Sequence, residues 1–388
     1  MKRNGVIAAI VLVVILAGSV LGTACAGAKG EAGPAGVGIQ SIVNNGNGTF
    51  TIKLTDGSSF TTDNFTGPQG LEGDTGAAGS TGGKGDTGSQ GSQGPQGLGY
   101  SPMQVAMLRW YKAIQTGNTI FVGSNTGAMC FDGANIWVPT LANNVVKIRA
   151  SDCLVEGAYA VGTAPVAACF DGANIWVANH TGDNVTELKA SDGSFIGTYA
   201  VGTHPNSICF DGTNIWVANY RSNNVTELKA SDGSLVGTYA AGTGPYYVCF
   251  DGTNIWVANY GSNDVTELKG SDGSLVGTFA AGSEPECVCF DGANIWVANT
   301  GSNNVTKLRA SDGNPLGTYT AGTRPTGLCF DGANIWVANY SSNNVTEVKA
   351  SDGTLVGTYS TGYGPQFLCF DGANVWVSNF SVASVMKL

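Results

Sequence analysis

Residues 169–188 read CFDGANIWVANHTGDNVTEL, and residues 209–228 repeat this segment almost unchanged as CFDGTNIWVANYRSNNVTEL. The opening cysteine returns along most of the chain, with one spacing of 39 residues and five of 40. Its seven copies are Cys130, Cys169, Cys209, Cys249, Cys289, Cys329 and Cys369. A period of this length, kept over seven copies, predicts a repeat architecture in which each unit packs against its neighbours.

Turn signals divide each unit into four short segments. The first ends in Cys-Phe, the second is NIWVAN, the third is close to NVTELKA and the fourth is close to LVGTY, with Asp-Gly and Ser-Asp-Gly turns between them. Four short strands at this period are typical of a β-propeller blade. In NIWVAN, Ile and Val should face one neighbour, and Trp and Ala the other, so both sheet faces are apolar. We therefore predict an all-β fold with a seven-bladed propeller of four-stranded blades.

The two ends of the repeat region predict how the ring closes. The last copy stops at residues 385–388, after its third strand, whereas TIFVG at residues 119–123 matches a fourth strand that precedes the first cysteine. We expect this N-terminal strand to complete the last blade, because closure removes the open sheet edges that invite aggregation. Residues 100–125 are thus a connector and closing strand, and residues 126–388 are the propeller repeats. Residues 101–114 would form a helix or a strand.

The segments IWVAN and SNNVTELKASDGSLVGTY, followed by Gly-Thr-x-Pro, resemble the 40-residue YVTN-type propeller repeat, a relative of NHL-like blades. The resemblance covers about residues 103–388. Trp stands in the second strand where that family usually has Tyr. The resemblance implies the propeller fold. It implies little about chemistry, since the family includes surface proteins and many members without a known activity.

The first residues have the features of an export signal. Two basic residues precede an apolar run over residues 6–20, which is short for a membrane span, and small residues follow. LGTAC at residues 21–25 resembles a bacterial lipobox, with Gly22 where that motif usually has Leu. The resemblance implies a leader over residues 1–25 and lipid attachment at Cys25, and the alternative is simple secretion after cleavage at a small residue. Both predict an exported chain, either lipid-anchored at the cell surface or secreted.

Glycine at every third residue marks two segments, residues 26–38 and 67–99. Strict Gly-X-Y spacing is typical of collagen, because only glycine fits at the axis of three wound chains. The pattern resembles the collagen-like stalks of bacterial surface proteins and implies a homotrimer, and the alternative is a flexible Gly/Ser/Gln linker. Between the two segments, residues 39–66 form a predicted β-hairpin module, in which TFTIKL and SSFTTD flank the turn Asp56-Gly57.

Composition and motifs argue against several classes of function. The net charge is −10, acidic residues outnumber basic ones by 28 to 18, and no basic run occurs, so we expect no nucleic-acid partner. The chain has two histidines and no phosphate loop, Ser-His-Asp set or paired-carboxylate motif, so we predict no cofactor and no catalytic residues. The repeated cysteines favour core packing over a soft-metal site, and the repeated Asp-Gly pairs favour hairpin turns over Ca²⁺ loops. We therefore predict no metal site.

Two positions in the repeat vary freely while the framework hardly changes. One follows the second strand, and the other surrounds the proline between blades. The loops after strands two and four emerge on the same face of an up-and-down blade, so these residues should gather around the mouth of the central channel. Tyr and Arg are enriched in binding interfaces, which favours a ligand-binding face over neutral variation of exposed loops. The candidate ligand-binding residues are His180, His204, Tyr220, Arg221, Tyr246, Tyr247, Tyr260, Glu284, Glu286, Arg324, Tyr340, Gln366 and Phe367.

These patterns predict a non-catalytic cell-surface protein for binding or adhesion, whose propeller head contacts a protein, glycan or envelope component. A trimeric stalk would present three heads and add weak sites by avidity, and the chain would reach a membrane only through the lipid anchor. One alternative is a propeller lyase or hydrolase with His204, Glu284, Glu286 and Arg324 at the channel mouth. Another is a purely structural surface-layer protein whose variable face has no ligand.

Overall fold

The computed structural model describes residues 39–44, 50–54, 59–61 and 118–388, which belong to two compact units, Met1–Val105 and Ala106–Leu388. The predicted leader with Cys25, both Gly-X-Y segments and most of the connector lie outside the described residues. Within the described residues, no helix has the length and apolar character that a membrane crossing requires.

The first unit contains a three-stranded antiparallel sheet. Its strands β1 (Ile39–Asn44), β2 (Phe50–Leu54) and β3 (Ser59–Thr61) lie in that order. β2 and β3 flank the Asp-Gly dipeptide, with Ile52 opposite Phe60. β1 pairs with the other edge of β2 and has an irregular register between Ile39 and Ser41. The predicted hairpin consists of β2 and β3, and β1 is an additional strand.

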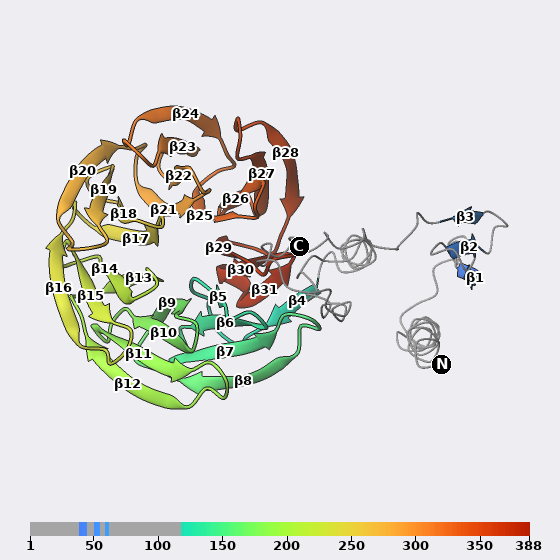
Figure 1. Ribbon diagram of the computed structural model, residues 1–388, viewed down its shortest axis with the longest axis horizontal. Coiled ribbons are helices and arrows are strands. Elements are labelled where there is room, and N and C mark those ends of the chain that lie inside the picture. The colour runs from blue at the N-terminus through green and yellow to red at the C-terminus, as the bar shows by residue number, and fades with distance from the viewer. Residues whose placement is uncertain (1–38, 45–49, 55–58, 62–117) are drawn as a thin grey trace, which may run out of the picture. The chain divides into compact units, whose positions relative to one another are not determined.

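The second unit consists of seven four-stranded antiparallel sheets, and Figure 1 shows them arranged as a ring. This confirms the predicted seven-bladed propeller of four-stranded blades. The seventh blade takes its outermost strand from the N-terminal side of the repeats, since β4 pairs with β31 and Ile120 lies opposite Val385.

The bounds of the strands, blade by blade, are as follows. Blade 1 is β5 (Cys130–Phe131), β6 (Asn135–Thr140), β7 (Asn144–Arg149) and β8 (Val155–Ala160); blade 2 is β9 (Pro165–Phe170), β10 (Asn174–Asn179), β11 (Asn184–Lys189) and β12 (Phe195–Ala200). Blade 3 is β13 (Pro205–Phe210), β14 (Asn214–Asn219), β15 (Asn224–Lys229) and β16 (Leu235–Ala240); blade 4 is β17 (Pro245–Phe250), β18 (Asn254–Asn259), β19 (Asp264–Lys269) and β20 (Leu275–Ala280). Blade 5 is β21 (Pro285–Phe290), β22 (Asn294–Asn299), β23 (Asn304–Arg309) and β24 (Pro315–Thr320); blade 6 is β25 (Pro325–Phe330), β26 (Asn334–Asn339), β27 (Asn344–Lys349) and β28 (Leu355–Ser360). Blade 7 is β29 (Pro365–Phe370), β30 (Val375–Asn379), β31 (Ser384–Lys387) and β4 (Asn118–Phe121), with the 3-10 helix η1 (Phe380–Val382) between β30 and β31.

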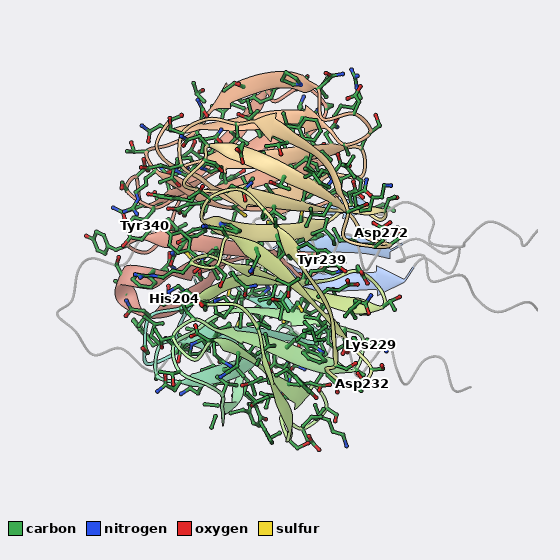
Figure 2. All side chains as sticks on the ribbon, turned by 90° about the vertical axis from the view of Figure 1, so that its left-hand side faces the viewer. His204, Lys229, Asp232, Tyr239, Asp272 and Tyr340 are labelled. Carbon is green, nitrogen blue, oxygen red and sulfur yellow. The ribbon has the colours of Figure 1, made fainter. Side chains whose placement is uncertain are left out.

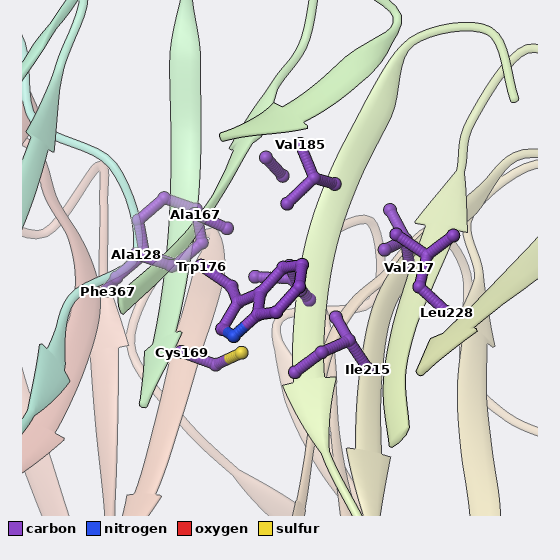
Figure 3. Packing of buried hydrophobic residues seen from close by; sticks show 11 residues of the cluster. Ala128, Ala167, Cys169, Trp176, Val185, Ile215, Val217, Leu228 and Phe367 are labelled. Atoms are coloured by element: carbon purple, nitrogen blue, oxygen red, sulfur yellow. The ribbon is translucent and has the colours of Figure 1, made fainter. Parts of the chain in front are cut away.

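Each blade buries its second strand between two neighbours. Trp176 of blade 2 packs against Ile215 and Val217 of blade 3 (Figure 3). On the other face of the same strand, Ile175 packs with Trp137 of blade 1. Trp and Ile thus face opposite neighbours, as the NIWVAN pattern predicted, and the core of the propeller lies between blades.

The Asp-Gly turn holds the buried tryptophan in place. In blade 4, one carboxylate oxygen of Asp251 accepts hydrogen bonds from the N–H groups of Thr253 at 2.8 Å and Asn254 at 2.7 Å, and the other accepts from Nε1 of Trp256 at 2.7 Å. The Asp–Trp bond recurs in every blade. Both carboxylate oxygens therefore serve the turn and the core, which supports the prediction of hairpin turns.

An aromatic ring of one blade lies against the turn glycine of the next. Gly233 has a φ of 69°, and a Cβ atom there would collide with the ring of Tyr199 in the preceding blade. The same arrangement pairs Gly193 with Tyr159, Gly273 with Tyr239, Gly313 with Phe279 and Gly353 with Tyr319. Blade 1 has Cys153 at this position, because the preceding blade supplies Ile120 of β4 instead of an aromatic ring, and the two side chains pack in one cluster.

The inner strands place the repeated thiols around the channel. Burial raises the pKa of Cys169, and the neighbouring thiols of Cys130 and Cys209 raise it further. Burial also raises the pKa of the other repeated cysteines. A thiol with a raised pKa stays protonated at neutral pH and is a weak nucleophile and metal ligand, which supports the packing interpretation.

Candidate ligand-binding face

The two variable positions of the repeat lie together on one face of the propeller. In blades 2 to 7 the residue after the second strand donates its N–H to the carbonyl of the residue before the proline, as Tyr220 does to His204 at 2.9 Å. Figure 2 shows His204 and Tyr340 on one side of the ring and Asp232 and Asp272 on the opposite side. We call the first side the variable face, which consists of the loops after the second strands and the connections between blades.

The residue before each of these prolines has a left-handed backbone. The φ angles are 53° at Ala164, 56° at His204, 65° at Gly244, 54° at Glu284, 61° at Arg324 and 65° at Gly364. An Asp or Asn of the preceding blade holds this conformation, since Asp183 Oδ1 accepts from His204 N at 2.8 Å and Asn263 Oδ1 accepts from Glu284 N at 2.8 Å. A left-handed conformation costs a residue other than glycine about 1–2 kcal/mol. Histidine, glutamate and arginine side chains therefore project from positions that suit glycine better.

The two histidines of the chain meet on this face. The ring centroids of His180 and His204 lie 4.6 Å apart, edge to face. His204 Nδ1 is 3.9 Å from a carboxylate oxygen of Asp183, and neither histidine Nδ1 atom has a hydrogen-bond partner. Burial lowers the pKa of His180, and His204 and the exposed Arg221 lower it further, which favours the neutral imidazole. Among the described residues, no three His, Cys, Asp or Glu side chains lie close enough together to hold a metal ion.

Three tyrosines form a contiguous cluster over blades 3 and 4. The ring of Tyr246 lies 6.0 Å from that of Tyr220, nearly perpendicular to it, and 5.7 Å from that of Tyr260. Burial raises the pKa of Tyr246, and the nearby carboxyl group of Glu286 raises it further. Burial also raises the pKa of Tyr260, to which Glu284 contributes. The neutral phenol form is therefore favoured at Tyr246 and Tyr260, and the cluster presents aromatic faces.

Glu286 is a buried carboxyl group beside this cluster. It lies on β21, it is 5% exposed, and burial raises its pKa to about 7. The positive charge of Arg324 opposes this rise, and the negative charge of Glu284 adds to it. A carboxyl group in this pKa range can donate or accept a proton at neutral pH.

An open hollow of about 480 Å³ lies on the variable face between blades 6 and 7. Tyr340 and Tyr363 line it together with Ser341, Asn343 and Ser381, and every lining side chain is uncharged. Tyr363 is 67% exposed. The hydroxyl group of Tyr340 lies 3.3 Å from Ser381 Oγ.

Two contacts determine how Tyr340 lies beside this hollow. The guanidinium carbon of Arg324 is 4.8 Å from the centroid of the Tyr340 ring, a cation–π contact. A Cβ atom on Gly364 would approach Tyr340 Cε2 to 3.1 Å, so the absence of a side chain at position 364 leaves room for the ring.

Two of the predicted ligand-binding residues lie inside the ring. Tyr247 of blade 4 and Phe367 of blade 7 stack with ring centroids 6.3 Å apart. Phe367 is 7% exposed and packs with Ala128 and Ala167. Burial raises the pKa of Tyr247, and the surrounding thiols raise it further. These two side chains fill the channel as part of the core, whereas the adjacent Gln366 is half-buried.

Tyr363 was not among the predicted site residues. The equivalent position is Thr163, Thr203, Thr243, Ser283 and Thr323 in the other connections, so tyrosine is a departure found in one copy. The predicted variable segment began one residue later, at the residue before the proline. A comparison of all seven copies position by position identifies Tyr363 as readily as Tyr340.

No family model matches this sequence, and no curated protein matches it. Among solved structures, a chain of the hydrazine synthase of Kuenenia stuttgartiensis is similar, with a TM-score of 0.62 and 20% sequence identity. The match covers 69% of this chain and 97% of that chain. At this level of identity the likeness concerns the fold alone: it supports the seven-bladed propeller and transfers no activity, although the name is that of an enzyme.

Proposed function

We propose that the propeller is a non-catalytic binding head whose variable face contacts a protein, glycan or envelope component. One observation carries the proposal: His204, Glu284 and Arg324 keep their side chains at left-handed positions, where Gly244 and Gly364 fill the same place in other blades. For stability alone glycine is the better residue at such a position. Side chains that are kept in spite of an unfavourable backbone conformation are concentrated at binding sites.

The surroundings of these residues support the same function. Tyr220, Tyr246 and Tyr260 add aromatic surface next to Glu284, and aromatic residues and arginine are the usual anchors of interfaces. The opposite face carries the repeated Asp-Gly turns, whose aspartates bond to the chain itself. The difference between the faces is what a rigid scaffold with one specialised surface requires.

The experiment compares the full chain with a triple variant, His204→Gly/Glu284→Gly/Arg324→Gly, on an array of glycans, peptides and cell-envelope fractions. The variant uses a residue that the chain already has at two equivalent positions, so we expect it to fold. The matched control changes three exposed residues of the opposite face, Lys189→Gln/Lys229→Gln/Lys269→Gln. Binding that is lost in the glycine variant and kept in the control supports the proposal. Binding lost only in the control places the ligand on the other face and contradicts it.

The proposal extends to the whole chain. The export signal, the lipobox-like segment at Cys25 and the Gly-X-Y runs support an exported protein, lipid-anchored or secreted, with a trimeric collagen-like stalk below the heads. Three heads on one stalk would bind a repetitive surface by avidity. Sedimentation of the purified chain as a monomer would exclude the trimer, and a mature N-terminus other than a lipid-modified Cys25 would exclude the anchor.

A second candidate function is catalysis at Glu286. The observation that favours it is a buried carboxyl group with a pKa of about 7, close to Glu284, Arg324 and Tyr246, as a general acid or base would need. The reaction class would be hydrolysis or elimination on a glycan. The test is turnover of a glycan panel by the full chain and by Glu286→Gln, which keeps the size of the side chain. Turnover that disappears in the variant would replace binding with catalysis as the primary function.

A further inference from the structure

We propose, building on the binding function above, that the hollow between blades 6 and 7 is a site for a neutral carbohydrate. Its lining combines the rings of Tyr340 and Tyr363 with the side chains of Ser341, Asn343 and Ser381. The inference names the class of ligand for one part of the variable face and depends on that face being a binding surface.

The lining of the hollow favours an uncharged ligand over a charged one. The hollow is lined by no Asp, Glu, Lys, Arg or His side chain, and the guanidinium of Arg324 lies over the Tyr340 ring. The chain as a whole has a net charge of −10, so polyanions are repelled rather than attracted. A ligand that fits this hollow makes its contacts through hydroxyl groups and C–H surfaces.

Sugars have both of these features on one ring. The C–H face of a pyranose packs on an aromatic ring, as apolar surface does on tyrosine. Its hydroxyl groups pair with serine hydroxyls and with the side-chain amide of Asn343, whose Oδ1 accepts from Gly364 N at 3.0 Å while its Nδ2 remains able to donate. Tyr363 is 67% exposed, so its ring is accessible to a ligand in the hollow.

The shape of the site also favours a sugar over a peptide. The hollow, at about 480 Å³, lies within the range of small-ligand sites. Its walls are loop residues 340, 341 and 343, connection residues 363–364 and residues 381–382 of η1, so among the described residues no free strand edge lies along it. An extended peptide is usually held by main-chain pairing with such an edge.

The departure from the repeat gives an independent argument. Blade 3 has the same tyrosine, Tyr220, against the same glycine, Gly244, yet its connection keeps Thr243. At the blade 6 to 7 connection Tyr363 replaces that threonine and supplies a second ring beside Tyr340. Two aromatic rings at one hollow can contact a sugar from two sides, and a single ring cannot.

The chain itself provides variants that should fold. Tyr363→Thr restores the residue of the other connections, and Tyr340→Thr introduces the residue that stands at position 300 in blade 5. Phe195→Leu is the matched control, because it removes an exposed aromatic ring outside the variable face and introduces the residue that stands at positions 235, 275 and 355 in other blades. Calorimetry with the full chain would measure affinity for neutral hexose and N-acetylhexosamine oligosaccharides, with uronic-acid oligosaccharides and a proline-rich peptide for comparison.

We expect a neutral oligosaccharide to bind, Tyr363→Thr and Tyr340→Thr each to weaken its binding by roughly ten-fold, and Phe195→Leu to change its affinity by less than about two-fold. The carbohydrate site would be overturned if Tyr363→Thr bound the neutral oligosaccharide with unchanged affinity. It would also be overturned if the full chain bound only the uronic-acid oligosaccharides or only the peptide. If the array finds a ligand that the triple glycine variant loses and Tyr363→Thr keeps, the binding function stands and the carbohydrate site falls. If nothing binds the full chain, both fall.

Discussion

Glycine at the left-handed positions of the variable face should make the propeller more stable than alanine at the same positions. The two triple variants to compare carry glycine or alanine at residues 204, 284 and 324. Both remove the same side-chain contacts, including the His180–His204 ring contact and the stacking of Arg324 on Tyr340. The difference between them therefore isolates the cost of a Cβ atom on a left-handed backbone.

The magnitude follows from two opposing terms. A left-handed conformation costs alanine about 1–2 kcal/mol at each site, as the φ angles of 54–61° require. Glycine loses roughly 0.5–1 kcal/mol more than alanine in backbone entropy on folding. The net advantage of glycine is therefore about 0.5–1 kcal/mol per site. Since the three sites lie on three different blades, the sum is about 1.5–3 kcal/mol.

Guanidinium denaturation followed by tryptophan fluorescence measures this difference, because the buried indoles report the packing between blades. Ala164→Gly is an internal control: it should stabilise by about 0.5–1 kcal/mol and leave ligand binding unchanged, since it removes no functional group. An alanine triple variant as stable as the glycine variant would refute the reasoning. The left-handed positions would then carry no cost, and the main support for a binding face would be lost.

Three further predictions concern the framework. Asp251→Ala should lower the free energy of unfolding by about 3 kcal/mol, because two backbone N–H groups and a buried indole N–H lose their acceptor. Chemical denaturation measures this beside Asp232→Ala, which loses only exposed turn bonds from Ser234. The folded-state pKa of Glu286, about 7, exceeds its ordinary value of 4.5, so this group's contribution is fully present below pH 4.5 and is lost as pH rises through 7. The loss amounts to about 3 kcal/mol, and Glu286→Gln should abolish it in a series of unfolding curves from pH 4 to pH 8; a pH dependence identical to that of the parent chain would contradict the burial of this carboxyl group. Deletion of residues 101–125 should expose the edge of β31, lower the melting temperature and promote aggregation, and a deletion variant as soluble and heat-stable as the parent would argue against the role of β4.

The blades could be predicted because their signals are local and repeated. Asp-Gly turns and the alternation of Ile, Trp and Val in each second strand act within a few residues, so they can be identified in one copy and checked in six others. Cys153 is a position that such local signals do not explain. A side chain is accepted at position 153 because its neighbour there is Ile120 and not an aromatic ring. Ile120 precedes the first repeat in the chain and packs against the same cluster through the pairing of β4 with β31. Contacts of this kind follow from the fold and are absent from the local pattern.

The variable face was predictable from loop geometry, but the direction of individual side chains was not. Tyr246 and Tyr247 are adjacent in the chain, yet Tyr246 joins the tyrosine cluster of the mouth and Tyr247 fills the channel with Phe367. On a strand, neighbouring side chains point in opposite directions, and which direction leads to the mouth depends on the register of the blade. The left-handed backbone at Glu284 was not predicted either. Glycine at the equivalent positions 244 and 364 is the sequence signal that indicates it.

The turn glycines under aromatic rings have a consequence for which blades can pack side by side where the two ends of the repeat region meet. In five turns a glycine lies under an aromatic ring of the preceding blade, whereas Cys153 packs in one cluster with Ile120. An aromatic ring over Cys153 would collide with its Cβ atom, and Ile120 over a glycine would leave a void. The pair therefore distinguishes the junction between blades 7 and 1, where the outer strand β4 comes from the N-terminal side of the repeats, from the five junctions that use glycine. An outer strand with an aromatic ring does not fit beside Cys153, so this turn favours β4 over the outer strands of blades 1 to 5 as its neighbour.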